Sequence, residues 1–448
     1  MHVNPQGNIF QASIVKSPRR SPGLPAVSRD NHIGQTLDRE KLDVRMPFDD
    51  SGNRARVDLL RQRGVDAWGP ERVYVSEDVD LDAIEAGAEI RQATLSGPEL
   101  SIAAGATIGT SGHAEVDNCQ IGRNVELGSG LYRGATFLEG VKFRGFAEVR
   151  PSTLLEEQAE AAHNVALKNT TFTSCCVAGS LINFCDLFLS GGRSRRDHTE
   201  IGSGAIHFNF DPRGHKWGSL IGGIRGVLLR SEPVFIGGNC GLVGPLEIGF
   251  GAVTAAGSVI RKDVAENTLA SEFGSTIRID GYDSRAYGLL QGSFMVTAKL
   301  VGTLRALDGW YATVRIPHAS AGDRRLYEAA RKQIDAQIKE RIERLAKIVE
   351  KLPQGFSQFS RGPRANQEHR RLVAGWERFR GVLEDPLEAG EPPVAFVQRY
   401  AAARESDRGH VESVKSADAG AADAERWLEG LVERVTSRAK RALTSGSP

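Results

Sequence analysis

A six-residue repeat constrains the fold of this chain more than any other feature. It runs through residues 100–260, where glycines and apolar residues recur in step. The first run of glycines is Gly122, Gly128, Gly134 and Gly140. The residues expected to point inwards are Val125, Leu131, Phe137, Phe143 and Val149, and later Ile236, Leu242, Ile248, Thr254 and Ile260. A period of six fits neither an amphipathic helix nor a simple alternating strand. It predicts a solenoid in which three short strands close one coil, with glycines at the corners.

Composition limits the classes of protein to consider. The chain has 448 residues and a formal net charge of +1, which indicates no bulk attraction to nucleic acid or to an acidic membrane. Its five cysteines include no CxxC pair, so reduced, buried thiols are predicted in preference to a zinc site or a disulfide framework. No apolar run approaches 18 residues, and the N-terminus has no apolar signal segment. We therefore expect a cytoplasmic protein without a membrane span.

The chain divides into five parts by composition and periodicity. Beyond the solenoid, apolar residues from Leu326 to Leu352 step by four and three, which predicts one stripe of a long amphipathic helix. The predicted parts are a disordered or extended arm (1–52), a short helix with the entry coil (53–99), the solenoid (100–270), a connector (271–322) and an α-helical domain (323–448).

Four segments interrupt the six-residue rhythm. Residues 153–169 have a helix-like composition, but Pro151 precedes them and a strand-like stretch follows, which favours irregular coils. The other three, at 190–200, 208–218 and 224–231, are polar or aromatic insertions. Insertions in solenoids tend to fall on one face, which is often the binding face.

Two cations are spaced by one coil. Arg150 and Lys168 lie 18 residues apart, which is three hexads, so they are expected to stack on neighbouring coils. Two stacked cations suit a phosphate or diphosphate, because arginine offers two donors and lysine adds a point charge. The alternative is a pair of solvated surface charges.

Polar residues near the second insertion form the other candidate site. Asn183, Asn209 and Asp211 are expected to bind a sugar or an acyl amide, although Asn and Asp also form turns. If the segment is extended, alternation puts His207 on the same side as Asn209 and Asp211. His207 or His198 is then a candidate general base, and a structural role is the alternative for either. No histidine pair has the spacing of a metal site.

These residues resemble the acetyltransferase half of bacterial N-acetylglucosamine-1-phosphate uridyltransferase/glucosamine-1-phosphate acetyltransferase. The resemblance covers about 100–270 and rests on VRPSTLLEEQAEAAHNVALKN, GSGAIHFNFD and FIGGNCGLVGPLEIGFGAVTAAGSVIRKDV. It implies that Arg150 and Lys168 hold the sugar phosphate and that Asn209 and Asp211 match the family's Asn-Tyr-Asp motif. It also implies that the small residues of the coenzyme site, which contact acetyl-CoA, are Gly238, Ala255 and Ala256.

The chain also departs from that family. The family's catalytic histidine falls on Ser180 and its sugar-contacting tyrosine falls on Asn183. The first 70 residues have no glycine-rich nucleotide loop, so a uridyltransferase half is not expected. The motifs GSLINFCD and HFNF are also similar to those of proteins described as related to UDP-N-acetylglucosamine pyrophosphorylase.

The sequence therefore predicts a left-handed parallel β-helix followed by an α-helical domain. The hand, and assembly as a homotrimer, are implied by the resemblance and not by the spacing. The predicted function is acyl transfer from acetyl-CoA to a sugar phosphate or nucleotide sugar, with His207 or His198 replacing the missing base. The alternative is a module that binds a nucleotide sugar, or serves as an assembly scaffold, without catalysis.

Overall fold

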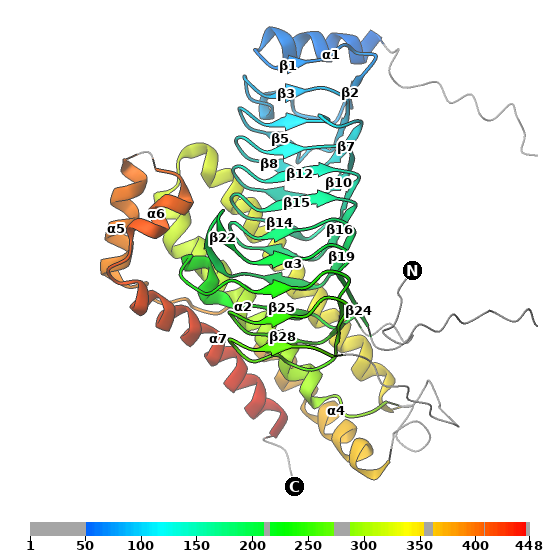
Figure 1. Cartoon of the computed structure of the whole chain (residues 1–448), viewed down its shortest axis with the longest axis vertical. Coiled ribbons are helices and arrows are strands. Elements are labelled where there is room, and N and C mark those ends of the chain that lie inside the picture. Colours follow the sequence, from blue (N-terminus) through cyan, green and yellow to red (C-terminus); the bar gives the residue numbers. More distant parts are fainter. Residues whose placement is uncertain (1–50, 210–215, 273–286, 354–361, 407, 445–448) are drawn as a thin grey trace, which may run out of the picture. The chain divides into compact units, whose positions relative to one another are not determined.

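The computed structural model describes residues 51–209, 216–272, 287–353, 362–406 and 408–444. These residues form a left-handed parallel β-helix of about eleven turns, followed by a helical region (Figure 1). The predicted fold class is thus confirmed. The arm predicted for residues 1–52 lies almost entirely outside the described residues.

The strands of the solenoid form three parallel sheets, here named A, B and C. Sheet A contains β1 (Asp66–Ala67), β3 (Glu89–Ile90), β6 (Thr107–Ile108), β9 (Glu126–Leu127), β12 (Lys142–Gly145), β15 (Glu160–His163), β18 (Val177–Ala178), β23 (Glu200–Ile201), β26 (Phe235–Ile236), β29 (Val253–Thr254) and β31 (Leu269–Ala270). Sheet B contains β2 (Val73–Val75), β4 (Ala93–Ser96), β7 (Ala114–Asp117), β10 (Gly130–Arg133), β13 (Ala147–Val149), β16 (Val165–Lys168), β19 (Ile182–Cys185), β24 (Ile206–Asn209), β27 (Gly241–Gly244) and β30 (Val259–Ile260). Sheet C contains β5 (Ser101–Ile102), β8 (Gln120–Ile121), β11 (Ala135–Phe137), β14 (Thr153–Leu155), β17 (Thr171–Phe172), β20 (Leu187–Leu189), β25 (Ser219–Ile221) and β28 (Glu247–Ile248).

Each coil runs from sheet A to B to C, and three columns of turns join the sheets. The A–B corner includes Phe146 and Leu181, the B–C corner includes Asp186, and the C–A corner includes Glu156 and Glu157. Residues 153–169, which the sequence left between helix and coil, form β14, β15 and β16, one strand on each sheet. This supports the prediction that the segment does not form a helix.

Aromatic side chains fill the solenoid at its centre. Tyr132, Phe137 and Phe143 come from sheets B, C and A, and their ring centroids lie 5.8–5.9 Å apart in edge-to-face pairs. The inward prediction for Leu131 is wrong, because Leu131 is 37% exposed and Tyr132 takes the inner position. The strands β7 and β10 pair with an offset of 16 residues, not 18. The inward residues Tyr132 and Phe137 are five residues apart, one fewer than the repeat, and a shift of one residue along a strand exchanges its faces.

Substitutions test this arrangement of the core directly. Phe137→Ala is expected to lower the free energy of unfolding by about 3–5 kcal/mol, because removal of the buried ring leaves a cavity in the core of the solenoid. Leu131→Ala, its matched control, is expected to change that free energy by only about 0.5 kcal/mol. Urea denaturation followed by circular dichroism measures both. Equal losses from the two variants would contradict the observed facing of β10.

Smaller elements cap the first coil and carry the insertions. Helix α1 (Ser51–Gln62) closes the first coil, and the Asn53 side chain donates to the Val73 carbonyl (3.0 Å) and accepts from the Val75 amide (2.9 Å). The insertion at 190–200 contains the antiparallel hairpin β21 (Gly192–Ser194) and β22 (Asp197–His198), and the insertion at 224–231 contains the 3₁₀ helix η4 (Ile224–Leu228). These two lie at the C–A corner, whereas the described ends of the insertion at 208–218, which follow β24 and precede β25, lie at the B–C corner. The insertions therefore flank sheet C and do not share one corner.

The helical region begins inside the range that was expected to be a connector. It contains two short helices, η5 (Tyr311–Arg315, a π-helix) and η6 (Ile316–His318). A further short helix, η3 (Leu81–Ala83), lies within the entry coil. The α-helices of this region are α2 (Gln291–Trp310), α3 (Ala321–Lys351), α4 (Pro363–Glu384), α5 (Val394–Glu405), α6 (His410–Ser416) and α7 (Ala421–Thr444). The apolar stripe predicted from Leu326 to Leu352 lies on α3, and its members are buried. Helix α2 packs against α3, α4 and α7.

The helices cover the outer face of sheet C. Leu154, Phe188 and Leu220, on β14, β20 and β25, belong to the same buried apolar cluster as the helices, not to the cluster inside the solenoid. Between them, Gln337 of α3 donates to the Thr171 hydroxyl (2.9 Å). Sheet C is therefore buried on both faces, which is typical of parallel sheets covered by helices.

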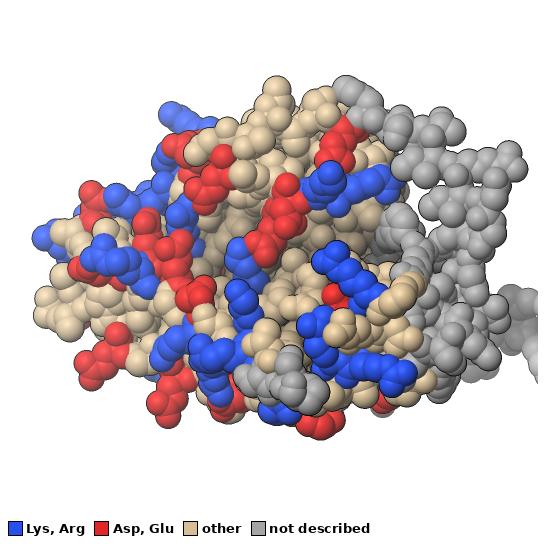
Figure 2. Space-filling view, turned by 90° about the horizontal axis from the view of Figure 1, so that it is seen from below, with Lys and Arg blue, Asp and Glu red and all other residues tan. Residues whose placement is uncertain are grey.

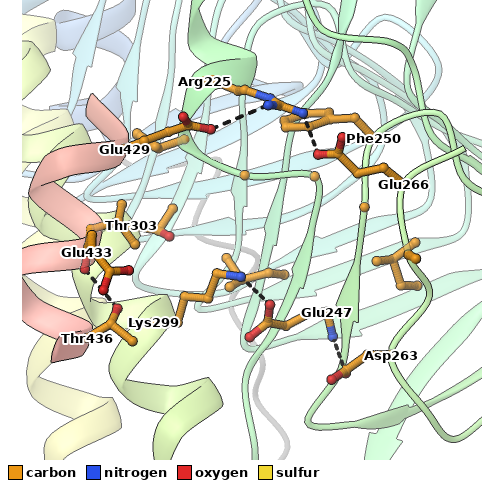
Figure 3. Close-up of a pocket in the computed structure, with 18 of the residues that line it drawn as sticks. Arg225, Glu247, Phe250, Asp263, Glu266, Lys299, Thr303, Glu429, Glu433 and Thr436 are labelled. Atoms are coloured by element: carbon orange, nitrogen blue, oxygen red, sulfur yellow. Dashed lines mark hydrogen bonds and ion pairs between the residues drawn. The ribbon is translucent and has the colours of Figure 1, made fainter. Parts of the chain in front are cut away.

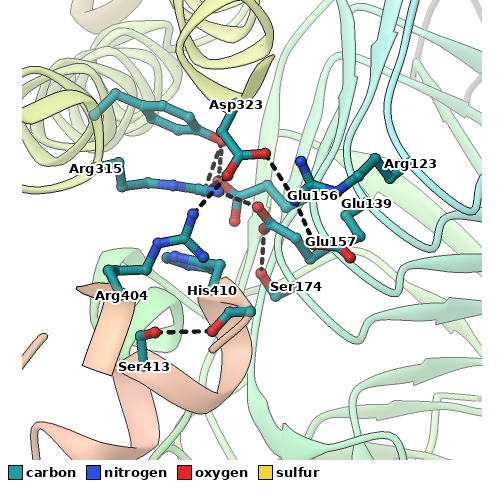
Figure 4. A network of polar contacts seen from close by, with 12 residues as sticks. Arg123, Glu139, Glu156, Glu157, Ser174, Arg315, Asp323, Arg404, His410 and Ser413 are labelled. Carbon is teal, nitrogen blue, oxygen red and sulfur yellow. Dashed lines mark hydrogen bonds and ion pairs between the residues drawn. The ribbon is translucent and has the colours of Figure 1, made fainter. Parts of the chain in front are cut away.

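A buried arginine fixes the helical region to the C–A corner (Figure 4). Arg315, at the end of η5, is 0% exposed and donates to Glu156 (3.0 Å) and to Glu157. The Tyr311 hydroxyl also donates to Glu156 (2.6 Å), and Ser174 donates to Glu157 (3.2 Å). Two carboxylates thus face one guanidinium. Burial, and then Glu157, raise the pKa of Glu156 to about 7 despite the opposing effect of Arg315.

A second buried arginine does the same at the B–C corner. Arg341 of α3 is 2% exposed and donates to the Asp186 carboxylate and to the Lys216 carbonyl (2.8 Å). Asn169 donates to the same Asp186 oxygen (2.7 Å). Removing one partner of such a buried pair costs about 3–5 kcal/mol, because it leaves the other charge without a partner.

The charge surplus at the C–A corner predicts a pH effect. Because the folded pKa of Glu156 lies above the unfolded value, its contribution to stability is present below about pH 4.5 and is lost as the pH rises through about 7. Glu156→Gln cannot ionise. As the pH rises from 5 to 8, the free energy of unfolding of Glu156→Gln should therefore increase relative to that of the wild type by on the order of 2 kcal/mol. Denaturant titrations at several pH values measure this, with Glu328→Gln, an exposed carboxylate on α3, as control. Parallel profiles for the wild type and Glu156→Gln would contradict the prediction.

Candidate functional site

The two candidate phosphate ligands stand side by side at the B–C corner. Val149 pairs with Leu167, and the Arg150 amide donates to the Leu167 carbonyl (2.9 Å), so Arg150 and Lys168 occupy neighbouring coils as their spacing predicts. Lys168 in turn pairs with Cys185 on the next coil. Arg150 donates to the Cys185 sulfur (3.4 Å), and its Nε atom is buried without a hydrogen-bond partner.

Further cations surround this stack. Burial, and then Asp186, raise the pKa of the Cys185 thiol, whereas Arg150, Lys168 and Lys216 lower it. Helix α3 adds two more arginines at this corner. We call the group the cationic corner, and its members are Arg150, Lys168, Lys216, Arg341 and Arg344.

Two of the candidate sugar ligands, Asn183 and Asn209, lie on strands of sheet B. Asn183 is exposed on the outer face of β19, where it pairs with Ile206 of β24. Asn209 is the last residue of β24, and Asp211 lies outside the described residues. Asn183 is therefore the candidate sugar ligand whose side chain is seen to face the solvent.

His207 points into the solenoid. Its Nε2 atom lies 2.7 Å from the Ser219 hydroxyl, and its Nδ1 atom lies 2.8 Å from the Cys185 carbonyl. Ser219 already accepts a bond from the Leu246 amide (2.9 Å), so we assign the hydroxyl as donor to Nε2 and Nδ1–H as donor to the carbonyl. Burial lowers the pKa of His207, which favours the neutral ring. Both nitrogens are thus occupied by groups of the fold.

His198 lies on the hairpin at the C–A corner. Its Nδ1 atom lies 2.9 Å from the Arg195 carbonyl, and its Nε2 atom lies 3.9 Å from Glu200. Arg195 holds this hairpin on the solenoid by donating to the Gln158 carbonyl (3.1 Å). The B–C corner with Arg150 and Lys168 is at the other edge of sheet C.

The candidate coenzyme residues lie at the A–B corner. Gly238 follows β26, and Ala255 and Ala256 follow β29, so each leads from sheet A into sheet B. Strand β30, which follows Ala256, is four strands from β16, which ends in Lys168. At about 4.8 Å per strand this is about 19 Å along the solenoid, in addition to the width of sheet B. Within one chain, the structure does not bring the two groups together.

The position that matches the family's histidine has a structural role here. The Ser180 hydroxyl accepts a bond from the His163 amide (3.4 Å), and the Ser180 amide donates to the Ser203 hydroxyl (3.1 Å). The Phe146 amide donates to Ser129 in the same way (3.1 Å). Serine hydroxyls therefore connect successive coils along the A–B corner.

His163 is a residue that the sequence analysis did not select. It is exposed, lies one coil before Ser180, and shares the A–B corner with Gly238. In the described part of the chain its ring has no hydrogen-bond partner. The signal that points to it is the offset of 17 residues between His163 and Ser180, which matches the 17-residue pairing of β16 with β19.

A cavity of about 800 Å³ lies elsewhere, between the last coils and helices α2 and α7 (Figure 3). Arg225 stacks on Phe250 (4.7 Å) and binds Glu266 and Glu429, while Lys299 binds Glu247. Carboxylates outnumber the cations in this lining, and they are Glu247, Asp263, Glu266, Glu429 and Glu433. The cavity is therefore unfavourable for a phosphate, and none of the candidate site residues lines it.

Charges of both signs are intermixed on the face of the protein that is seen from below. Figure 2, which views the protein from the lower end of the solenoid, shows basic and acidic side chains next to each other on this face. The cationic corner is thus a local feature in a chain of net charge +1. Within the described ranges, no group of three His, Cys, Asp or Glu residues is placed to hold a metal ion, and no helix is long and apolar enough to span a membrane.

Comparison with known proteins places this geometry among relatives. The bifunctional protein GlmU of Nitratidesulfovibrio vulgaris (strain DP4) is 32% identical over 259 residues, which cover 55% of this chain and 52% of that protein. GlmU of Pseudomonas fluorescens (strain Pf0-1) is 38% identical over 149 residues (33% and 29%). GlmU of Streptococcus thermophilus (strain LMD-9) is 28% identical over 236 residues (50% and 46%). The chain is related to GlmU.

The relation to GlmU covers part of each protein. The chain spans at most about half the length of the curated relatives that it matches. No family model matches the chain. The relation agrees with the resemblance that the solenoid motifs indicate. The two activities that the word "bifunctional" denotes are those of the GlmU proteins.

Proposed function

We propose that this protein binds a phosphorylated sugar at the cationic corner and acylates it with acetyl-CoA. The observation that carries the proposal is the stack of Arg150 on Lys168, in a solenoid related to GlmU. The buried Nε atom of Arg150 makes no hydrogen bond and lies 3.8 Å from the Glu148 carboxylate. Among the described residues, Lys168 has one carboxylate within 4 Å, that of Glu340 at 3.8 Å. A phosphate would give both cations a short, charge-assisted partner. Asn183, Asn209 and Asp211 are proposed to bind the sugar.

The proposed site takes residues from two subunits of a homotrimer. The phosphate ligands lie at the B–C corner, and the proposed acetyl-CoA residues Gly238, Ala255 and Ala256 lie at the A–B corner. A second copy that brings its A–B corner to the B–C corner would complete the site. Phe146 (67% exposed) and Leu181 (61% exposed) support such a contact, because both are bulky residues held at positive φ and exposed on the A–B corner. Sheet C is covered by the chain's own helices and would take no part.

We propose His163 as the general base in place of the residue that Ser180 replaces. The amine of the sugar would attack the thioester carbon, a C–N bond would form, and the C–S bond to coenzyme A would break. His163 would take the proton from the attacking amine, and the thiolate would leave. His163 is the better placed histidine, because His207 has both nitrogens occupied and His198 lies at the C–A corner. The five free cysteines favour a reducing compartment such as the cytoplasm.

Kinetics of acetyl transfer from acetyl-CoA to glucosamine 1-phosphate test this proposal. Lys168→Met is expected to raise KM for the sugar phosphate about tenfold, because it removes a charge-assisted contact. His163→Asn is expected to lower kcat by about 10²- to 10⁴-fold with little change in KM. Lys142→Met, an exposed lysine on sheet A, is the matched control and should behave as the wild type.

Mixing experiments test the shared site. Equimolar Lys168→Met and His163→Asn subunits, unfolded and refolded together, should regain part of the wild-type activity, because some sites then combine two intact corners. Unmixed variants treated in the same way should not. Binding of glucosamine 1-phosphate without any acetyl transfer by the wild type would refute the enzyme and leave a binding module. Failure to bind it would refute the site itself.

A further inference from the structure

A carboxylate of the helical region already occupies the cationic corner. Glu340 of α3 places one oxygen, Oε1, 3.1 Å from Arg344, 3.8 Å from Lys168 and 3.8 Å from Arg341. Glu340 is 20% exposed, so solvent reaches it. Three cations from two different parts of the chain therefore converge on a single oxygen atom.

The environment keeps this carboxylate charged. Burial raises the pKa of Glu340, but Arg341, Arg344 and Lys168 outweigh it, and the pKa lies below its ordinary value. Of the three cations, Arg341 has a better partner in Asp186. Lys168 and Arg344 have no other carboxylate within 4 Å among the described residues. Glu340 thus serves as the shared counter-charge of these two.

We propose that the phosphate of the ligand displaces Glu340 and binds between Lys168 and Arg344, so that the helical region forms part of the anion site. This inference rests on the proposed function, because it concerns the same phosphate. It adds Arg344 as a ligand and makes Glu340 an internal competitor that weakens the binding of anions. A phosphate carries more charge and more acceptor oxygens than a carboxylate, so it can satisfy both cations at once.

The position of Glu340 on α3 gives the exchange its physical basis. Glu340 precedes Arg341, which anchors α3 to Asp186 and is buried. The backbone at this point of α3 is therefore held in place, and the exchange needs only a change of rotamer by Glu340. Arg344, one helical turn further, lies on the same face of α3 and is 28% exposed. It is close enough to follow the ligand without moving the helix.

Isothermal titration calorimetry of the full-length protein with glucosamine 1-phosphate, and separately with inorganic phosphate, tests the inference. Glu340→Gln keeps the size of the side chain and removes the competing charge, so it is expected to tighten binding about fivefold. Arg344→Met removes one of the three cationic ligands, the other two being Arg150 and Lys168, and is expected to weaken binding about tenfold. Thermal unfolding of each variant, expected near the wild-type midpoint, confirms that it is folded.

The control variants lie on the same helix. Lys339 and Asp335 form an exposed ion pair one turn apart, with Nζ and Oδ2 2.6 Å apart. Lys339→Met and Asp335→Asn change the net charge of α3 by the same amounts as the test variants. Both are expected to leave binding within about twofold of the wild type, because an exposed pair interacts weakly and is screened by salt.

The outcomes separate the inference from the proposed function. If Glu340→Gln fails to tighten binding, or if Arg344→Met weakens it no more than Lys339→Met does, Glu340 is not displaced and the inference is overturned. In that case a wild type that still needs Lys168 retains the proposed site. If the wild type binds neither probe, the proposed function fails together with the inference.

Discussion

Two buried arginines determine how this protein is organised. Arg315 and Arg341 belong to the helical region, and their side chains bind carboxylates of the solenoid at opposite edges of sheet C, at the C–A and B–C corners respectively. A buried guanidinium without its carboxylate is far more costly than the paired one, so each pair permits only one way to dock the helices. Leu154 and Phe188 contribute buried apolar surface to the interface between the solenoid and the helices. The arginine pairs determine the position of the helices along the solenoid.

This docking covers one sheet of the solenoid and leaves other parts of its surface exposed. Sheet C becomes an interior sheet, and sheet B and the A–B corner keep their outer faces, where exposed apolar side chains such as Phe146 and Leu181 remain. The B–C corner has both roles. Asp186 there anchors Arg341, while Lys168, one coil earlier, meets Glu340 of the same helix. The anion site that we propose at this corner would therefore combine residues of the solenoid and of the helical region.

The sequence predicted the fold because the solenoid is a local, repeated pattern. The glycine beat and the buried apolar positions, such as Phe137 and Ile248, report short strands in register, and the spacing of Arg150 and Lys168 follows from one coil. The inward prediction for Leu131 is wrong because the coil that contains it is shorter than three hexads, and no residue in that coil indicates the shorter length. A period is informative only while every coil keeps it.

The rest of the site depends on contacts between distant parts of the chain. Alternation placed His207 with Asn209, but it did not reveal that the ring bridges Cys185 and Ser219 inside the solenoid. Glu340 meets Lys168 across 172 positions of sequence, and within α3 it is only one charged residue among many. Such pairs have no local signature. Such contacts can be identified only from the packing of α3 against sheet C in the structure.

The central claim is that buried arginine–carboxylate pairs fix the helical region on the solenoid, and a double-mutant cycle tests it most directly. Asp186→Asn, Arg341→Met and the double variant are compared with the wild type by urea denaturation. If the pair acts as the structure indicates, the two single losses are strongly non-additive, with a coupling free energy of about 2 kcal/mol or more. Losses that add within about 0.5 kcal/mol would show that the two residues act independently and would contradict the account.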